Sequence, residues 1–541
     1  MVPITDVDID RNGVPPALRA VYEQARGHAA QGNWHRAAEA VALLRSDVTD
    51  SVPIATLVST ILLQRGQYRD AHAALLEAAR PPIDSPELLL QVVRGLKRFE
   101  EPELLKKLVE GSDWRKTRSL PHLAELAQHL GMSGLYELAE DCLSQALEIA
   151  PDYADAHYLR GLFEMFSGHK KESTTSIRRA LEANPGMANA HWLLSMQESE
   201  QSARSHVDEI RRVLPAAAPG SEARAYFDYS LHHSLHAMGR YEEAWQALER
   251  GHATMRRLAG YRPGEQHALV ESLERMALPS YEPSPMPESG GGTGLIFIVG
   301  MFRSGTTLIE RVLAGHPDVT DGGETYQLSA CLRQAADHDT FDAVDGSVVS
   351  RAATIDFDAV RQRMHAYAHW RAQGRRWLTE KLPSNFLNVG FILHAFPEAR
   401  IVHMRRDPVE TCFSNLRTIF RGAAPYACDQ RALADYFLLY RRLMAHWNTV
   451  APGRILEIDY AEFVGNPTIQ ARRLLEYCDL EFLPSVLDLD RQGGASATAS
   501  AAHVRNGILK DRHTQWVPYE RHLRPMLEIL SSLPANGANP Y

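Results

Sequence analysis

Cysteine is scarce in this chain, and no stretch of it stays apolar for long. Its 541 residues include five cysteines, an odd number without CxxC spacing, which is typical of reduced thiols rather than of a disulfide framework. No apolar run approaches the about 18 residues of a membrane span. The N-terminal residues MVPITDVDIDRNG lack the basic and apolar regions of a signal peptide. We therefore expect a cytoplasmic protein without a membrane span.

Excess positive charge and metal-ligand motifs are missing as well. The net charge of −9 argues against a general nucleic-acid binder, and the 24 histidines show neither HExxH nor paired Cys–His spacing. We expect no nucleic-acid partner and no metal site. An apolar content of 45% and a charged content of 23% are ordinary for a folded protein. The chain is too long for a single core, and its length predicts about two to four domains.

An internal repeat of 34 residues runs through the first half of the chain, which has the composition of successive helices. Residues 146–162, ALEIAPDYADAHYLRGL, and residues 180–196, ALEANPGMANAHWLLSM, match at many positions. Other residues keep the same interval. The clearest pairs 34 apart are Pro151 and Pro185, His157 and His191, Gly32 and Gly66, and Gly134 and Gly168.

A helix–turn–helix unit of this length, with small residues where helices touch, resembles the tetratricopeptide repeat. Each helix pair cannot bury its apolar face alone, so neighbouring pairs stack into a solenoid. The stretch from Pro81 to Gly131 is helical but off the pattern, and a copy from Met238 is out of register, which leaves the number of repeats open. A generic helical array is the alternative. The resemblance implies that the repeats bind a protein partner or recruit a peptide.

A change of composition marks a second domain. Residues 279–294, PSYEPSPMPESGGGTG, are rich in Pro, Gly and Ser and predict a linker between domains of residues 1–278 and 295–541. After the linker, short apolar runs alternate with helical patterns, which predicts an α/β domain with a central parallel sheet. The predicted strands are Leu295–Val299, Arg376–Thr379, Arg400–Met404 and Arg454–Ile458, with helices at Asp358–Gln373 and Arg431–Thr449.

The first predicted strand ends in a glycine-rich loop that lacks the lysine of an ATP- or GTP-binding loop. Gly300-Met-Phe-Arg-Ser-Gly305 is followed by Thr306 and Thr307, not by Lys-Thr. A helix that begins after such a turn points backbone N–H groups at an anion, and Arg303 supplies a full charge within the loop. Ser304, Thr306 and Thr307 add hydroxyl donors. A tight turn without a ligand is the alternative.

The stretch VGMFRSGTTLIERVLAGHPDV, residues 299–319, resembles the 5′-phosphosulfate loop of sulfotransferases, in particular of the protein-tyrosine sulfotransferase-like branch. The resemblance implies a P-loop-type sulfotransferase domain that takes 3′-phosphoadenosine 5′-phosphosulfate (PAPS) as sulfuryl donor. The implied donor-binding residues in this loop are Arg303, Ser304, Gly305, Thr306 and Thr307.

Three further motifs fit the same family. RIVHMRRDPVETCFSNL, residues 400–416, provides Arg406 and, eight residues later, Ser414, which the resemblance assigns to the 3′-phosphate of the donor. WLTEKLPSNF, residues 377–386, places Lys381 at a strand end, where the resemblance puts it beside the bridging oxygen of the donor. HPDVTDGGETYQL, residues 316–328, supplies Glu324, the implied base for the acceptor hydroxyl. The last segment of the family pattern corresponds to HVRNGILKDRHTQWVPYE, residues 503–520. This segment departs from the family pattern between Gly507 and Thr514.

A sulfuryl group carries less negative charge than a phosphoryl group, whose transfer relies on Mg²⁺. Arg303, Lys381 and backbone dipoles can therefore suffice without a metal. With the family resemblance, this implies in-line transfer from PAPS to an acceptor hydroxyl, of a peptide or protein tyrosine or of a small hydroxyl compound. A P-loop kinase or NTPase is disfavoured by Thr306. The altered segment leaves another alternative open, a repeat scaffold whose sulfotransferase domain has lost its activity.

Overall fold

The computed structural model describes residues 14–45, 51–80, 83, 85–278, 293–340, 343–420, 422–489 and 514–533. Contacts divide the chain into two compact units. One unit comprises Met1–Leu159 with Tyr326–Met364, and the other comprises Arg160–Thr325 with His365–Tyr541. The predicted linker lies outside the described residues except for Thr293 and Gly294, and the predicted boundaries 1–278 and 295–541 stay a prediction.

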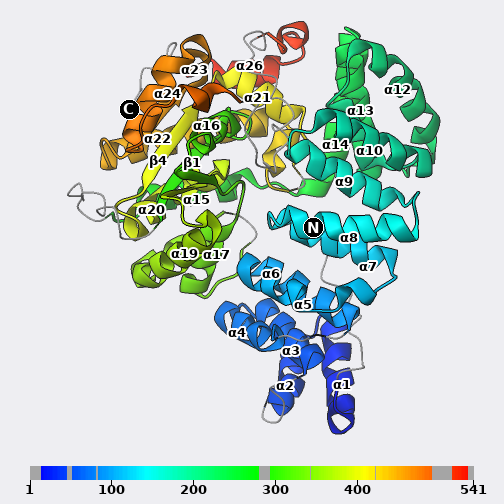
Figure 1. Ribbon diagram of the computed structural model, residues 1–541. Helices are drawn as coiled ribbons and strands as arrows, with labels where there is room; N and C mark the ends of the chain where they lie inside the picture. The colour runs from blue at the N-terminus through cyan, green and yellow to red at the C-terminus, as the bar shows by residue number, and fades with distance from the viewer. Residues whose placement is uncertain are drawn as a thin grey trace. The chain divides into compact units, whose positions relative to one another are not determined.

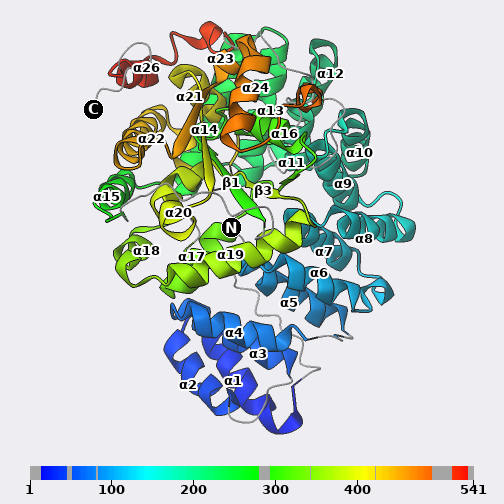
Figure 2. The ribbon, with the colours of Figure 1, turned by 60° about the vertical axis from the view of Figure 1, so that its left-hand side comes forward.

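Helices fill the described chain up to residue 278, and they follow one another as pairs (Figures 1 and 2). In the first unit α1 packs on α2, α3 on α4, α5 on α6, and α7 on α8. Their bounds are Arg19–Ala30, Trp34–Arg45, Val52–Gln64, Tyr68–Ala78, Pro86–Arg98, Pro102–Glu110, Leu120–Met132 and Tyr136–Ile149 for α1 to α8. The same unit holds α17, Gln327–Ala336, and α18, Gly346–Ser350. Helix α19, Phe357–Ala372, runs past Met364 into the second unit.

The next helices continue this arrangement in the second unit, where α13 packs on α14. Helix α9, Ala154–Phe166, begins just before that unit, and its Gly161 carbonyl accepts a hydrogen bond from Ser173 of α10 at 2.7 Å. The bounds of α10 to α15 are Lys170–Ala183, Ala188–Ser195, Glu200–Val213, Glu222–Ala237, Tyr241–Ala259 and Pro263–Glu274. Among the residues that the structure describes, no helix combines the length and the apolar character that crossing a bilayer requires.

The turns between paired helices share one backbone geometry. Gly32, Gly66, Gly134 and Gly168 have φ values of 73°, 74°, 74° and 76°, and the N–H of each following residue binds a carbonyl five residues back. Glu100 stands 34 residues after Gly66 and has a φ of 53°. Its following N–H makes the same bond, at 3.0 Å. The 34-residue register therefore runs through the stretch that looks irregular in sequence, with a glutamate in a conformation that favours glycine.

The repeated histidines have a common structural task. His157 Nε2 lies 2.8 Å from the carbonyl oxygen of Pro151, and His191 Nε2 lies 2.9 Å from that of Pro185. Each imidazole thus ties the first helix of its pair to the turn before it. This contact gives a physical reason why the proline and the histidine both recur at an interval of 34.

A five-stranded parallel sheet lies in the second unit, with strand order β2-β3-β1-β4-β5. The strands are β1 Gly294–Gly300, β2 Val319–Asp321, β3 Trp377–Glu380, β4 Arg400–Arg405 and β5 Ile455–Asp459. The four predicted strands are confirmed. The short β2 was not predicted, because Val319 is its only apolar residue. The predicted fold class, helical repeats followed by an α/β domain with a parallel sheet, is confirmed.

Buried side chains on one face of β1 join the sheet to its helices. Ile296 and Ile298 contribute to a core that includes Leu308 and Ile309 of α16, Thr306–Ala314, and Leu474 of α24, Pro467–Tyr477. Other helices of this unit are α20 Val389–Ala395, α21 Pro408–Leu416, α22 Gln430–Val450, α23 Tyr460–Gly465 and α26 Arg524–Leu530.

Candidate functional site

The carboxyl ends of four neighbouring strands carry the predicted site residues. Glu324 follows β2, Lys381 follows β3, the Arg303 loop follows β1, and Arg406 follows β4. Because all these strands are parallel, their carboxyl ends lie at one edge of the sheet. Along this edge the residues therefore follow the strand order, as Glu324, Lys381, Arg303 and Arg406. Ligands of open α/β sheets bind at this edge, where the strand order reverses, and here the reversal occurs at β1.

Glycine is required at two positions of the loop after β1. Gly305 has a φ of 107°, and a Cβ atom there would lie 2.7 Å from the ring of Tyr460. A Cβ atom on Gly300 would lie 2.7 Å from the carbonyl oxygen of Met404. The loop therefore packs against the ends of β4 and β5 without room for side chains. Helix α16 begins at Thr306, so its first unpaired N–H groups face the loop.

Two of the predicted donor-binding motifs meet in space. The Arg303 side chain donates from Nε to the hydroxyl of Ser414 at 3.1 Å, across 111 residues of sequence. Arg406 donates from Nη1 to the backbone oxygen of Arg303 at 3.3 Å. Arg303, Arg406 and Ser414 also line one cavity. The structure therefore brings these three predicted residues together, with two guanidinium groups at one place.

Local interactions hold Arg406 in position. Its Nε lies 3.0 Å from Oε2 of Glu410, and its guanidinium carbon lies 4.6 Å from the centre of the Tyr460 ring. Asp407 caps helix α21 by accepting the N–H of Glu410 at 2.9 Å, and Pro408 occupies the first turn. This capping follows the sequence pattern Asp-Pro. It fixes the start of the helix that carries Ser414.

The loop hydroxyls are buried around the start of α16. Ser304, Thr306 and Thr307 have exposed fractions of 1%, 4% and 3%. The hydroxyl of Ser304 has no hydrogen-bond partner among the residues that the structure describes. A buried hydroxyl without a partner is costly, so an anion that accepts from it would fit this loop.

Lys381 is completely buried and lies between two carboxylates. Its Nζ atom is 2.6 Å from Oε1 of Glu324 and 3.6 Å from Oε2 of Glu310. Its backbone N–H donates to the carbonyl of Gly323 at 3.1 Å, which joins the end of β3 to the loop after β2. Glu324 remains partly exposed, at 24%. The structure thus pairs Lys381, the predicted cation that stabilises the leaving group, with Glu324, the predicted base.

Glu310 on α16 was missed by sequence reasoning. Its Oε1 atom accepts the N–H of Gly323 at 3.1 Å and lies 3.4 Å from the hydroxyl of Thr379. Burial raises the pKa of Glu310, and the charge of Lys381 offsets part of that rise. A glutamate in an amphipathic helix is normally expected on the solvent side. Every residue from Thr306 to Leu313 is buried, however, and nothing in the local pattern shows that both sides of this helix are covered.

Comparison with known proteins agrees with this geometry. A family model described as "Sulfotransferase family" matches residues 296–484. This part of the chain is a sulfotransferase-family domain. An Aquifex aeolicus protein described as uncharacterized is 24% identical over 524 residues, which cover 87% of this chain and 68% of the relative. Protein-tyrosine sulfotransferase 2 of Gallus gallus is 22% identical over 298 residues, or 51% of this chain and 80% of the relative.

The chain was also compared with solved structures. The sulfotransferase domain from the curacin biosynthetic pathway is 17% identical, with a TM-score of 0.30, over 44% of this chain and 97% of that domain. The matched residues 296–484 contain all nine predicted site residues. The altered segment from Gly507 lies outside the described residues up to position 513, so its contribution to the sulfotransferase-family domain stays a prediction.

Proposed function

We propose that this protein is a sulfotransferase that moves a sulfuryl group from PAPS to an acceptor hydroxyl. The observation that carries the proposal is the meeting of Arg303 with Ser414 and Arg406 at the end of β1. Arg303 comes from one motif that indicates an anionic donor, and Arg406 and Ser414 come from another. The two motifs are separate in sequence. Two cations at a helix N-terminus suit the phosphosulfate and 3′-phosphate groups of one nucleotide.

Each donor-binding residue has a proposed role. Arg303, the loop amides and the hydroxyls of Ser304, Thr306 and Thr307 bind the phosphosulfate end, while Gly305 permits the close approach of the backbone. Arg406 and Ser414 bind the 3′-phosphate. The Ser304 hydroxyl supports this assignment because it is buried without a partner among the described residues. PAPS supplies the sulfuryl group when bound.

The Lys381–Glu324 pair suits the transfer itself. Glu324 takes the proton of the acceptor hydroxyl as the oxygen attacks, because its carboxylate is the partly exposed member of the group. Lys381 stabilises the negative charge that develops on the leaving phosphate oxygen. Glu310 holds the Gly323 N–H and keeps the loop that carries Glu324 beside Lys381. No step of this proposal uses a metal ion.

The acceptor that we propose is a tyrosine in a peptide or protein. The distant similarity to protein-tyrosine sulfotransferases supports this choice, and helical repeats commonly provide extended surfaces for peptides. The helices before residue 278 would then recruit the acceptor or a partner protein.

Radiolabelled PAPS tests the proposal directly. The full-length protein is incubated with labelled PAPS and with tyrosine-containing peptides, serine-containing peptides or phenolic compounds, and the labelled product is identified by mass spectrometry. We expect label on tyrosine, and we expect Arg303→Ala to abolish the transfer. Full activity of Arg303→Ala would refute the assignment of the loop.

A thermal-shift measurement separates an active enzyme from an inactive scaffold. 3′-Phosphoadenosine 5′-phosphate, the product nucleotide, should raise the melting temperature by binding the folded state alone. ATP with Mg²⁺ is the control ligand. No shift at high concentrations of the product nucleotide would favour a scaffold that has lost its donor site. A shift with ATP and Mg²⁺ but not with the product nucleotide would favour a P-loop NTPase.

A further inference from the structure

Repeat helices form one wall of the cavity that holds the proposed donor site. The segment from α11 to α13 contributes Glu198, His233 and His236 to the lining of the cavity, and the sulfotransferase-family domain contributes Arg303, Arg406 and Arg417. All of these residues belong to the second compact unit. The cavity into which two proposed donor-binding arginines project is therefore closed by residues far from the sulfotransferase-family domain in sequence.

A histidine of α13 contacts both the backbone and the side chain of Arg417. His233 Nε2 lies 2.9 Å from the carbonyl oxygen of Arg417, and His233 Nδ1 lies 3.3 Å from Arg417 Nη2. A carbonyl only accepts and a guanidinium only donates, so His233 must carry its proton on Nε2 and accept at Nδ1. Burial, together with the charge of Arg417, lowers the pKa of His233 to about 3. The imidazole is thus neutral at physiological pH, as this pair of contacts requires.

Two further contacts orient Arg417. Its Nη1 donates to Oε1 of Gln515 at 3.0 Å, and its guanidinium carbon lies 5.3 Å from the centre of the Phe413 ring. The guanidinium is therefore held on one side by a repeat helix, on another by the C-terminal segment, and below by an aromatic side chain of α21. These contacts fix the orientation of the planar guanidinium.

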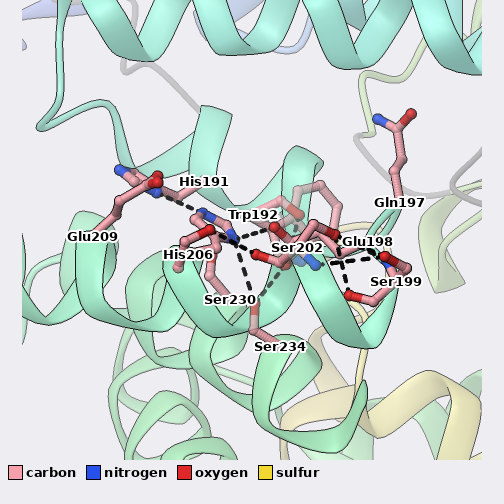
Figure 3. A network of polar contacts seen from close by, with 12 residues as sticks. His191, Trp192, Gln197, Glu198, Ser199, Ser202, His206, Glu209, Ser230 and Ser234 are labelled. Carbon is pink, nitrogen blue, oxygen red and sulfur yellow. Dashed lines mark hydrogen bonds and ion pairs between the residues drawn. The ribbon is translucent and has the colours of Figure 1, made fainter. Parts of the chain in front are cut away.

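A buried polar chain that includes Glu198 connects α13 with α11 and α12 (Figure 3). Ser234 donates to Glu198 Oε2 at 2.9 Å, and Glu198 Oε1 lies 2.9 Å from His206 Nδ1. His206 Nε2 lies 2.8 Å from His191 Nδ1. Because His191 uses its Nε2–H for the Pro185 carbonyl, His206 donates from Nε2, and one proton is shared between His206 Nδ1 and Glu198. These contacts connect the three helices through buried polar side chains.

We propose that His233 is a positioning residue of the donor site, which holds the Arg417 guanidinium in the cavity as a third cation for the 3′-phosphate. This inference rests on the proposed function, because it takes Arg406 and Ser414 as the binding site of that phosphate. It adds that the repeat helices are part of the donor site as well as a surface for partners. The donor could not bind fully to a sulfotransferase-family domain whose repeat helix α13 was displaced.

Calorimetric titration of full-length variants tests this role. The ligands are 3′-phosphoadenosine 5′-phosphate and AMP, which lacks the 3′-phosphate. For His233→Ala we expect affinity for the bisphosphate to fall about tenfold or more, as for a lost hydrogen bond to a charged group. Affinity for AMP should change by less than about twofold. With PAPS as donor, KM should rise while kcat stays close to the wild-type value.

Two conservative variants separate the contact with the guanidinium from the contact with the backbone. The Oδ1 atom of asparagine can stand where Nδ1 of histidine stands, so His233→Asn should retain most of the affinity for the bisphosphate. Glutamine can replace the Nε2–H donor but provides no acceptor near Nδ1, so His233→Gln should behave like His233→Ala. If His233 had only a structural role, His233→Gln would bind the bisphosphate as tightly as His233→Asn or more tightly.

His252→Ala is the matched control. His252 of α14 is also buried and donates from Nε2 to the carbonyl of Leu416 at 2.9 Å, the residue before Arg417, without lining the cavity. It should lower the melting temperature and leave the ratio of the two nucleotide affinities unchanged. Equal effects of His252→Ala and His233→Ala, or a normal ratio in His233→Ala, would overturn the inference while the proposed function stands. A wild-type protein that binds neither nucleotide would overturn both.

Discussion

The Nζ atom of Lys381 lies 2.6 Å from Oε1 of Glu324, so the proposed cation of the leaving group and the proposed base form an ion pair. Lys381 is completely buried, and a buried charge is tolerated only when it is paired. Glu310 provides a second carboxylate at 3.6 Å. Because of this second partner, Glu324 can turn to a substrate proton without leaving the ammonium group alone.

Replacing Glu324 by glutamine should therefore affect chemistry far more than folding. We expect kcat to fall about 10²- to 10⁴-fold, the usual contribution of a positioned base. Product-nucleotide affinity and melting temperature should stay near wild type, because Lys381 keeps Glu310. Initial rates with labelled PAPS and calorimetry measure these quantities. Asp318→Asn is the control, because it removes an exposed carboxylate from the same stretch. An unchanged kcat in Glu324→Gln would rule out this residue as the base.

Glu310 should matter for stability and activity together. The variant Glu310→Gln retains an acceptor for the Gly323 N–H, whereas Glu310→Ala leaves that group and the Thr379 hydroxyl without it. An unsatisfied buried donor costs about 1–3 kcal/mol, and a cavity adds to this cost. We expect a clear loss of unfolding free energy in urea for the alanine variant, with lower kcat, and a smaller loss for glutamine. Equal stability of the two variants would contradict the proposed bond to the loop.

Sequence patterns predicted the frame of the site because the responsible forces are local. A buried parallel strand reads as an apolar run, and Asp407-Pro408 caps a helix through contacts within four residues. The meeting of Arg303 with Ser414 needed the known order of motifs in a family, since no local rule joins residues 111 positions apart. Glu310 could not be predicted, because its role depends on burial of α16 from both sides.

The helical half shows the same limit. The interval between Gly32 and Gly66 reveals the repeat because glycine is the residue that a left-handed turn favours. Glu100 keeps the same turn with a φ of 53°, but a glutamate in the sequence does not indicate a left-handed conformation. The contact of His233 with Arg417 spans 184 residues and joins two regions that composition assigns to separate domains. Only tertiary packing could reveal it.

Gly305→Ala should impair donor binding through strain. The alanine would need a φ near 107°, and its Cβ atom would meet the Tyr460 ring at 2.7 Å, the ring that stacks on Arg406. Such strain costs about 1–3 kcal/mol, so we expect a lower melting temperature and a weaker thermal shift with the product nucleotide. Gly264→Ala is the control, since a Cβ atom there meets nothing within 4 Å. Full nucleotide binding by Gly305→Ala would show that the loop tolerates side chains.

Acidification should destabilise the second unit through its buried histidines. Burial lowers the pKa of His191 and of His252 to about 4, and that of His233 to about 3. In the unfolded chain each would bind a proton near pH 6.5, so unfolding takes up protons between about pH 6.5 and pH 4. Stability is complete above pH 6.5 and falls as the pH decreases, and each of these histidines takes up about one proton on unfolding. Urea denaturation from pH 7.5 to 5 measures this slope. His252→Gln should reduce it by about one proton, exposed His169→Gln should not, and constant stability over this range would contradict the buried neutral state of these histidines.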